Sequence, residues 1–272
     1  MSLYSNLLLR KLFLPLFARF NPGDIRIKHH YTGDRFLLHS FKHKGYWFHG
    51  KNREAETMER FSRLVKPGDT VFDIGGHIGY LTLYFSRLAG AAGRVYVFEP
   101  GKNNLRYLEQ NIRGKQNIVL VPKGAGNIDG NLDFFLEDLT GQNNSFVDHY
   151  SILDDNAKRA FVRPRVAKDT VEVVRLDTFA AGKGIHPDFV KIDVEGFELE
   201  VLLGMERILD GHHPLLMIEV TRNKNELHAL LKRHGYECYN SSMKKVTDSA
   251  EISLNTFCFS AEFHAKVLET IR

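Results

Sequence analysis

The sequence predicts an α/β protein built on a mostly parallel sheet with helices on both faces. Apolar, strand-like runs alternate with amphipathic, helix-like segments from Asp69 to Tyr239, the pattern of repeated strand–helix–strand units. One strand-to-helix junction, residues 69–82, turns through Gly75, Gly76 and Gly79. Glycines in such a turn let a nucleotide-like ligand approach the backbone closely. We therefore expect the chemistry of the protein at the carboxyl ends of the strands.

Composition sets the size and setting of this fold. The 272 residues are 43% hydrophobic and 26% charged, which suits one large domain with a small addition. We expect an N-terminal extension at 1–53 and the main domain at 54–272. The net charge of +4 fits an anionic substrate or a membrane surface and is too small to indicate nucleic acid. Two cysteines allow no disulfide framework, so a reducing, cytoplasmic setting is expected.

The extension contains two predicted elements. Residues 3–20 are rich in Leu and Phe, but charges and Pro15 interrupt them, so they fall short of the ~20 apolar residues of a membrane span. They are expected to form a helix that packs on the domain or a partner subunit, or one that lies on a membrane surface. Residues 29–49 are aromatic and alternate, which predicts a β-hairpin or small meander.

The main domain is divided by its apolar periodicity into strands and helices. Strands are expected at 71–74, 94–98, 117–121, 132–136, 171–176, 189–193, 215–220, 236–239 and 255–259. Helices are expected at 52–65, 80–88, 103–112, 151–161, 198–209 and 225–234. The last two strands, joined by a polar loop, would form an antiparallel hairpin at one edge of the sheet.

Two acidic residues indicate which cofactor the glycine turn holds. Glu99 ends the next strand about 20 residues further on, where a carboxylate accepts hydrogen bonds from a ribose. Asp73 precedes the glycines, where a dinucleotide would place its pyrophosphate. A carboxylate there would repel phosphate and attract the ammonium or sulfonium of S-adenosylmethionine. The glycine spacing also departs from Gly-x-Gly-x-x-Gly, so S-adenosylmethionine is favoured over a nicotinamide dinucleotide.

Four short runs together resemble one family. They are Asp73-Ile-Gly-Gly-His-Ile-Gly79, Phe98-Glu-Pro100, Arg175-Leu-Asp-Thr-Phe179 and Lys191-Ile-Asp-Val-Glu-Gly-Phe-Glu198. In order and spacing they are similar to the FkbM family of S-adenosylmethionine-dependent methyltransferases, from about residue 54 to 220. The resemblance implies a class I methyltransferase, Rossmann-like fold with seven strands, the last antiparallel. It also implies O-methylation, frequently of sugars or other secondary-metabolite hydroxyls.

The resemblance also implies roles for residues of these runs. Family members more often carry Asn where this chain has His77, which leaves the role of that side chain open. The candidate cofactor-binding residues are Asp73, Gly75, His77, Gly79 and Thr82 around the methionine part, Glu99 at the ribose, Asn127 near the adenine and Asp193 facing the methyl donor. An ordinary turn residue is an equally good interpretation of Asn127.

Transfer to a hydroxyl needs a group that takes its proton. The catalytic candidates are Asp193, Glu195 and Glu219, with His77 behind them. Asp193 and Glu219 end neighbouring strands of the expected sheet, and two such carboxylates could share a divalent cation such as Mg²⁺. They could equally be a cofactor contact and a structural cap. Lys191, inside a strand, is expected to pair with a carboxylate.

Two other functions fit parts of the sequence. One is an NAD-dependent reductase, which Asp73 and the glycine spacing disfavour. The other is a non-catalytic, methyltransferase-like binding protein, which the acidic strand ends disfavour. The acceptor pocket must come from residues 1–53 and 124–169. The expected partners are a small-molecule or glycan acceptor, a membrane surface touched by residues 1–20, and further copies of the chain, without nucleic acid.

Overall fold

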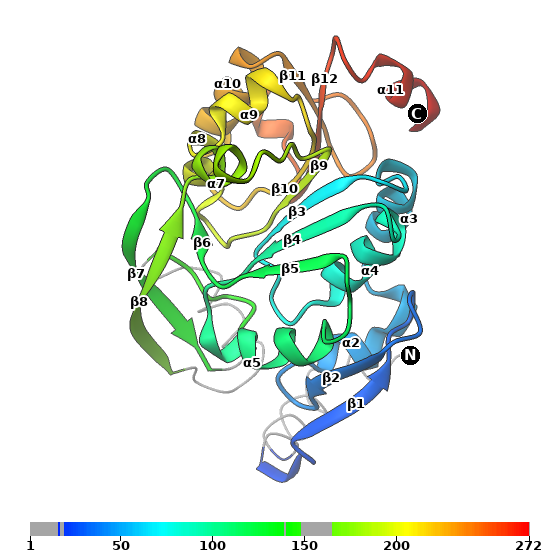
Figure 1. Ribbon diagram of the computed structural model, residues 1–272, viewed down its shortest axis with the longest axis vertical. Coiled ribbons are helices and arrows are strands. Elements are labelled where there is room, and N and C mark those ends of the chain that lie inside the picture. Colours follow the sequence, from blue (N-terminus) through cyan, green and yellow to red (C-terminus); the bar gives the residue numbers. More distant parts are fainter. Residues whose placement is uncertain (1–15, 17–18, 139, 148–164, 272) are drawn as a thin grey trace.

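The structure is a computed structural model that describes residues 16, 19–138, 140–147 and 165–271. A central sheet with helices on both faces is flanked by a smaller sheet and by the N-terminal elements (Figure 1). No helix among the described residues is both long and apolar enough to cross a membrane. The predicted helix at 151–161 lies outside these residues, as does nearly all of the one at 3–20.

The central sheet has, in the described part of the chain, the seven strands that were predicted. In spatial order they are β11 (Tyr236–Tyr239), β12 (Asn255–Ser260), β10 (Leu215–Glu219), β9 (Phe189–Ile192), β3 (Thr70–Ile74), β4 (Arg94–Phe98) and β5 (Ile118–Val121). Strands β10, β9, β3, β4 and β5 run parallel, and β12 is antiparallel to both of its neighbours. The mostly parallel sheet is therefore confirmed, with β12 inserted between β10 and β11.

Helices cover both faces of this sheet. One face carries α7 (Leu176–Lys183), α8 (Glu198–Leu203), α9 (Glu206–Gly211) and α10 (Lys224–Arg233); the other carries α3 (Ala55–Leu64), α4 (Tyr80–Ala89) and α11 (Ala265–Ile271), and α5 (Lys102–Asn111) lies near the extension. The single helix predicted at 198–209 is wrong. The chain turns at Gly204, where a Cβ would lie only 1.9 Å from the carbonyl oxygen of Gly126.

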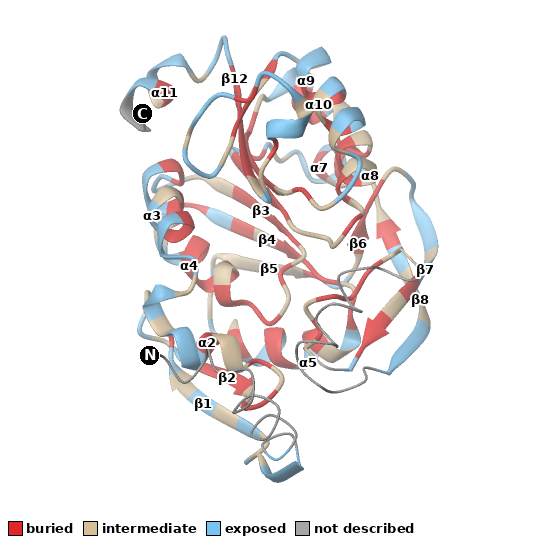
Figure 2. Ribbon diagram, turned by 180° about the vertical axis from the view of Figure 1, so that it is seen from behind, coloured by how far each residue is buried: buried red, intermediate tan, exposed pale blue. Residues whose placement is uncertain are grey.

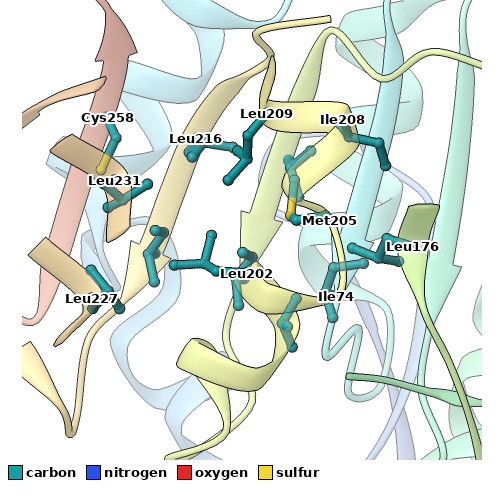
Figure 3. Packing of buried hydrophobic residues seen from close by; sticks show 14 of the residues in the cluster. Ile74, Leu176, Leu202, Met205, Ile208, Leu209, Leu216, Leu227, Leu231 and Cys258 are labelled. Carbon is teal, nitrogen blue, oxygen red and sulfur yellow. The ribbon is translucent and has the colours of Figure 1, made fainter. Parts of the chain in front are cut away.

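The two faces contain separate apolar layers because side chains along a strand alternate. Phe72 and Ile74 of β3 belong to the layer under α7–α10. Figure 3 shows part of that layer, with Leu209 beside Leu216 of β10. Val71 faces the opposite layer, and β9 is buried along its whole length, with β3 and β10 buried at all but one residue each (Figure 2). By the same alternation Asp73 shares the side of Val71.

The N-terminal extension differs from its prediction. Strands β1 (Asp24–Lys28) and β2 (Arg35–His39) pair antiparallel, and α2 (Lys44–His49) is a helix, so the hairpin predicted over 29–49 is wrong. Of the three consecutive aromatics at 46–48, only Tyr46 is buried, while the exposed fractions of Trp47 and Phe48 are 37% and 46%. A strand would have put residues 46 and 48 on one side, whereas a helix turn buries residue 46 alone.

A second sheet stands beside the first at the end of β5 (Figure 1). It contains β6 (Gly124–Ala125), β8 (Val166–Val174) and β7 (Gly130–Glu137). The strands predicted at 132–136 and 171–176 are β7 and β8, although β8 ends before Leu176. Residues 140–147, between these two strands, return toward the central sheet, where they help to line the pocket described next.

Candidate active site at the carboxyl ends of the strands

A cavity of about 300 Å³ lies at the carboxyl ends of the central strands. Residues that directly follow a strand form its floor: Gly75, Gly76 and His77 after β3, Glu99 and Pro100 after β4, Asp193, Val194 and Glu195 after β9, and Glu219 at the end of β10. Its volume is at the lower end of the range of small-molecule pockets. The place and size fit the ligand site of an open α/β sheet.

The glycine turn is packed too tightly for any side chain. Gly75 has φ +79°, and a Cβ there would lie 1.8 Å from the carbonyl oxygen of Asp193. The amides of Gly75 and Gly76 both donate to the carbonyl of Phe98, at 2.9 and 3.0 Å. The turn is thereby fixed to the end of β4 and leaves its other side open to the cavity.

Lys191 lies beneath this turn, with 3% of its side chain exposed. Its Nζ donates to the carbonyl of Gly75 at 2.7 Å and lies 3.4 Å from carboxylate oxygens of both Asp73 and Asp193. The predicted pairing of Lys191 with a carboxylate is confirmed. Burial lowers the pKa of Lys191, but the two carboxylates outweigh burial and raise it, so the side chain stays charged.

Glu99 presents a fixed carboxylate to the cavity. Its oxygens accept hydrogen bonds from the amide of His77 at 2.8 Å, the amide of Gly101 at 2.9 Å and the side chain of Asn104 at 3.2 Å. Burial raises the pKa of Glu99 to about 7, while these hydrogen bonds favour the ionised form. A carboxylate held this way can accept hydrogen bonds from the hydroxyls of a ribose.

The opposite end of the cavity floor is acidic. One carboxylate oxygen from each of Asp193, Glu195 and Glu219 lies within 4.8 Å of the others. The charge of Asp193, followed by burial, raises the pKa of Glu219 to about 8. Such a cluster can accept a proton near neutral pH, and carboxylates at this separation can also hold a divalent cation.

Some predicted site residues lie away from the cavity. Asp73 is fully buried behind the glycine turn, where the hydroxyl of Thr82 donates to it at 2.6 Å. Gly79 begins α4, against Leu108. Asn127 lies outside the lining, and its carbonyl accepts from Arg175 at 2.7 Å. Asp73, Gly79 and Thr82 shape the turn, and the direct contacts predicted for all four residues stay predictions.

The chain before the main sheet adds residues to the lining. Tyr46 and Arg53 belong to the segment 1–53 that was expected to supply the acceptor pocket, whereas Glu54 was not predicted. The Arg53 guanidinium carbon lies 4.5 Å from the ring centre of Tyr46. No spacing pattern indicates such contacts between distant segments. Glu198 is different, because it belongs to the run from 191 to 198. It accepts from the amide of Gly196 at 2.7 Å and so holds the turn after β9.

Fold and site together define an α/β protein that binds a nucleoside-type cofactor at the carboxyl edge of its sheet. Residues 73–238 match the model of the family described as the methyltransferase FkbM domain. The chain therefore belongs to the FkbM family of S-adenosylmethionine-dependent methyltransferases. This match covers more than half of the sequence and includes the glycine turn, Glu99 and the acidic strand ends. No curated protein matches the chain.

Solved structures with similar folds include three methyltransferase-type proteins. Methyltransferase FkbM from Methylobacillus flagellatus KT is 18% identical with a TM-score of 0.45; the match covers 74% of this chain and 50% of that one, so this chain spans half its length. Aeropyrum pernix fibrillarin, with natively bound S-adenosyl-L-methionine, is 15% identical with a TM-score of 0.45 and 87% of each chain covered. M. jannaschii TYW2 in complex with AdoMet is 15% identical with a TM-score of 0.44. The match covers 87% of this chain and 83% of that one.

Proposed function

We propose that the protein transfers the methyl group of S-adenosylmethionine to a hydroxyl oxygen of a sugar, glycan, glycolipid or secondary metabolite. The observation that carries this proposal is Glu219, which lines the cavity beside Asp193 with its pKa raised to about 8. A carboxylate with a pKa near the working pH suits a base that removes a hydroxyl proton during the reaction.

The residues of the site fit S-adenosylmethionine on their donor and acceptor chemistry. Glu99 offers acceptors for the ribose hydroxyls, and the turn at Gly75 leaves room for close approach to the backbone. Asp193 and Glu219 present negative charge to a sulfonium and an ammonium. A dinucleotide would bring a pyrophosphate to the same turn, where Asp73 lies directly behind the glycines. These features support the methyl donor over a nicotinamide cofactor.

In the reaction, the bound cofactor supplies a methyl group on a sulfonium whose thioether leaves as a neutral group. The protein holds the acceptor oxygen about 3 Å from that methyl, which lowers the barrier by several kcal/mol. Glu219 takes the hydroxyl proton as the new carbon–oxygen bond forms. Lys191 pairs with Asp193, and the charge of Asp193 raises the pKa of Glu219. Glu195, directly before Gly196, borders the same space.

The acceptor side of the cavity favours an uncharged, hydroxyl-rich molecule. Arg53 is the cation of this wall, and its Nη2 pairs with Glu54 Oε1 at 3.1 Å. Asp193 and Glu195 add negative charge, and Glu219 adds more when it is ionised, whereas Lys191 is covered by the glycine turn. Hydroxyl groups can donate to these carboxylates and accept from the guanidinium, but an anionic group would meet net repulsion. Sugar hydroxyls meet this requirement.

A binding and product experiment tests the proposal. The protein should bind S-adenosylmethionine in calorimetry and, given a cofactor labelled in its methyl group, should place the label on a hydroxyl oxygen in an extract of host glycans. Mass spectrometry of the product would identify the acceptor. Cofactor binding without transfer to any hydroxyl-bearing compound of the panel would contradict the proposed activity and favour a binding role.

A divalent cation is the second way in which this site could activate a hydroxyl. Asp193, Glu195 and Glu219 offer the oxygen ligands that Mg²⁺ prefers. Such an ion would lower the pKa of a coordinated hydroxyl. Thorough chelation separates the two mechanisms: unchanged methyl transfer leaves Glu219 as the base, and loss that added Mg²⁺ restores assigns the role to the ion.

A further inference from the structure

Residues 140–144 cover the cofactor end of the cavity. The carbonyl of Gly141 accepts from Asn104 Nδ2 at 2.9 Å, and the same Nδ2 donates to Glu99 Oε1 at 3.2 Å. Asn144 donates to Asn103 at 2.8 Å. The segment 140–144 is thus connected to the carboxylate that is proposed to hold the ribose, and its position determines how the cofactor end is closed.

Thr140 fixes the start of this segment. Its amide donates to Glu137 Oε1 at 2.9 Å, and its hydroxyl donates to the same carboxylate. Its carbonyl oxygen points to the imidazole of His77, whose Nε2 lies 3.3 Å away. This carbonyl has two lone pairs and can accept two donors.

The contacts of His77 determine its tautomer when the ring is neutral. A carbonyl oxygen can only accept, so Nε2 must carry the hydrogen that Thr140 receives. Nδ1 is then an acceptor, and the hydroxyl of Tyr46, 3.1 Å away, donates to it. His77 therefore joins the glycine turn, through its backbone, to α2 and to Thr140, through its ring.

His43 comes from the extension and lies beside His77. The amide of His39 donates to His43 Nδ1 at 2.9 Å, which leaves the hydrogen of the neutral ring on Nε2. The two imidazoles meet edge to face, with 5.4 Å between ring centres. The hydrogen bond to the Thr140 carbonyl favours the protonated form of the His77 ring.

Burial and nearby cations keep both rings neutral. Burial lowers the pKa of His77 to about 3, and Arg53 and Lys191 act in the same direction against the Thr140 carbonyl. Burial lowers the pKa of His43 to about 2, with smaller contributions in that direction from His77, His39 and Lys42. Both rings thus offer one donor and one acceptor across the physiological range.

We propose that His77 is a positioning residue, whose Nε2–H holds the Thr140 carbonyl and so keeps residues 140–144 over the cofactor, with the His43 ring packed edge to face against it. One ring comes from the extension and the other from the glycine turn, so the arrangement joins three distant parts of the chain. The effect on cofactor binding rests on the proposed cofactor site. The hydrogen bonds themselves do not depend on it.

The variant His77→Phe tests this inference, because it keeps a ring of similar size and removes the donor to Thr140. We expect faster hydrogen exchange of the amides at 141–146 and about tenfold weaker binding of S-adenosylmethionine. The control is His264→Phe, which removes a half-buried imidazole that accepts from the amide of Ser260 and does not line the cavity. Equal exchange at 141–146 in His77→Phe, His264→Phe and wild type would overturn the proposal.

Nitrogen NMR of the imidazoles gives a readout that a merely structural role would not produce. Both His43 and His77 should show the Nε2–H tautomer without titration between pH 5 and 8. Tyr46→Phe, which removes one hydroxyl from a buried ring, should shift His77 toward the Nδ1–H tautomer. An Nδ1–H tautomer or a titrating ring in the wild type would contradict the assignment. If wild type binds no S-adenosylmethionine, the proposed function fails while exchange and NMR still decide on the two histidines.

Discussion

Two carboxylates at the ends of adjacent strands have different environments in this site. Asp193 lies 3.4 Å from the Lys191 ammonium. Glu219 has the negative charge of Asp193 beside it, and its pKa rises to about 8. Neighbouring positions on parallel strands thus place one carboxylate, Asp193, against the Lys191 ammonium. The other carboxylate, Glu219, can exchange a proton. The division of roles follows from which of them contacts the buried lysine.

The first prediction concerns Glu219. Because its pKa is raised, the base is protonated below about pH 8, and methyl transfer should rise as the pH increases through that value. Glu219→Gln should lower the transfer rate by about 10²- to 10³-fold and remove this pH step. Binding of S-adenosylmethionine, measured by calorimetry, should change little. A variant that retains the pH step would assign the proton transfer to another group.

A second prediction concerns Glu99. Glu99→Gln replaces one acceptor oxygen with an amide and should weaken binding of S-adenosylmethionine about tenfold, or about 1.4 kcal/mol. Glu226→Gln, an exposed change on α10, is the matched control and should bind as wild type does. Calorimetry on wild type, Glu99→Gln and Glu226→Gln compares their affinities for S-adenosylmethionine. Equal affinities would place the ribose elsewhere.

At the scale of elements, the glycine turn can be tested against a second glycine of similar backbone conformation. Gly75 and Gly90 have φ of +79° and +67°, but a Cβ at Gly90 meets nothing within 4 Å. Gly90→Ala should cost about 1 kcal/mol of unfolding free energy and leave cofactor binding intact. Gly75→Ala should cost more and should abolish binding. Urea unfolding and calorimetry measure the two effects, and retained binding in Gly75→Ala would count against the proposed turn.

The β3–β9 pair carries a second prediction at this scale. Lys191 is the register partner of Asp73, whose side chain is fully buried. Lys191→Met should lower the unfolding free energy by about 3–5 kcal/mol, because it leaves an uncompensated buried charge. Adding Asp73→Asn should recover part of that loss in urea unfolding. No recovery in the double variant would mean that the pair does not explain the cost.

The sequence predicted best those elements whose burial is uniform. Apolar runs such as 189–192 and 215–218 are buried on both sides and can only be central strands. The extension was misjudged, because a run of three aromatics does not reveal that only Tyr46 faces the core. The break between α8 and α9 depends on the approach of Gly126 to Gly204, and no local pattern carries that information.

At the scale of the whole molecule, the extension is part of the site. Phe36, Leu38 and Tyr46 belong to the same apolar layer as Leu83 and Phe85 of α4. This packing places the end of α2 and the following residues against the cavity. Tyr46, Arg53 and Glu54 of the cavity lining therefore lie outside residues 73–238, the part that matches the family.

The arrangement of the whole molecule also explains which site residues could be predicted from the sequence. Gly75, Glu99, Asp193 and Glu219 follow strands whose order the alternation of elements predicts, so their convergence was predictable. Tyr46 meets His77 across 31 positions of sequence, and His77 meets Thr140 across 63. Contacts of this kind arise only when the extension and the β7–β8 connection fold back onto the sheet.

The most direct test of the whole account is calorimetric titration of the intact chain with S-adenosylmethionine and, separately, with NADH. The acidic strand ends, the fixed Glu99 carboxylate and the glycine turn predict saturable, one-to-one binding of S-adenosylmethionine and no heat of binding from NADH. Absence of S-adenosylmethionine binding at millimolar ligand, or tight binding of NADH, would contradict the proposed cofactor site.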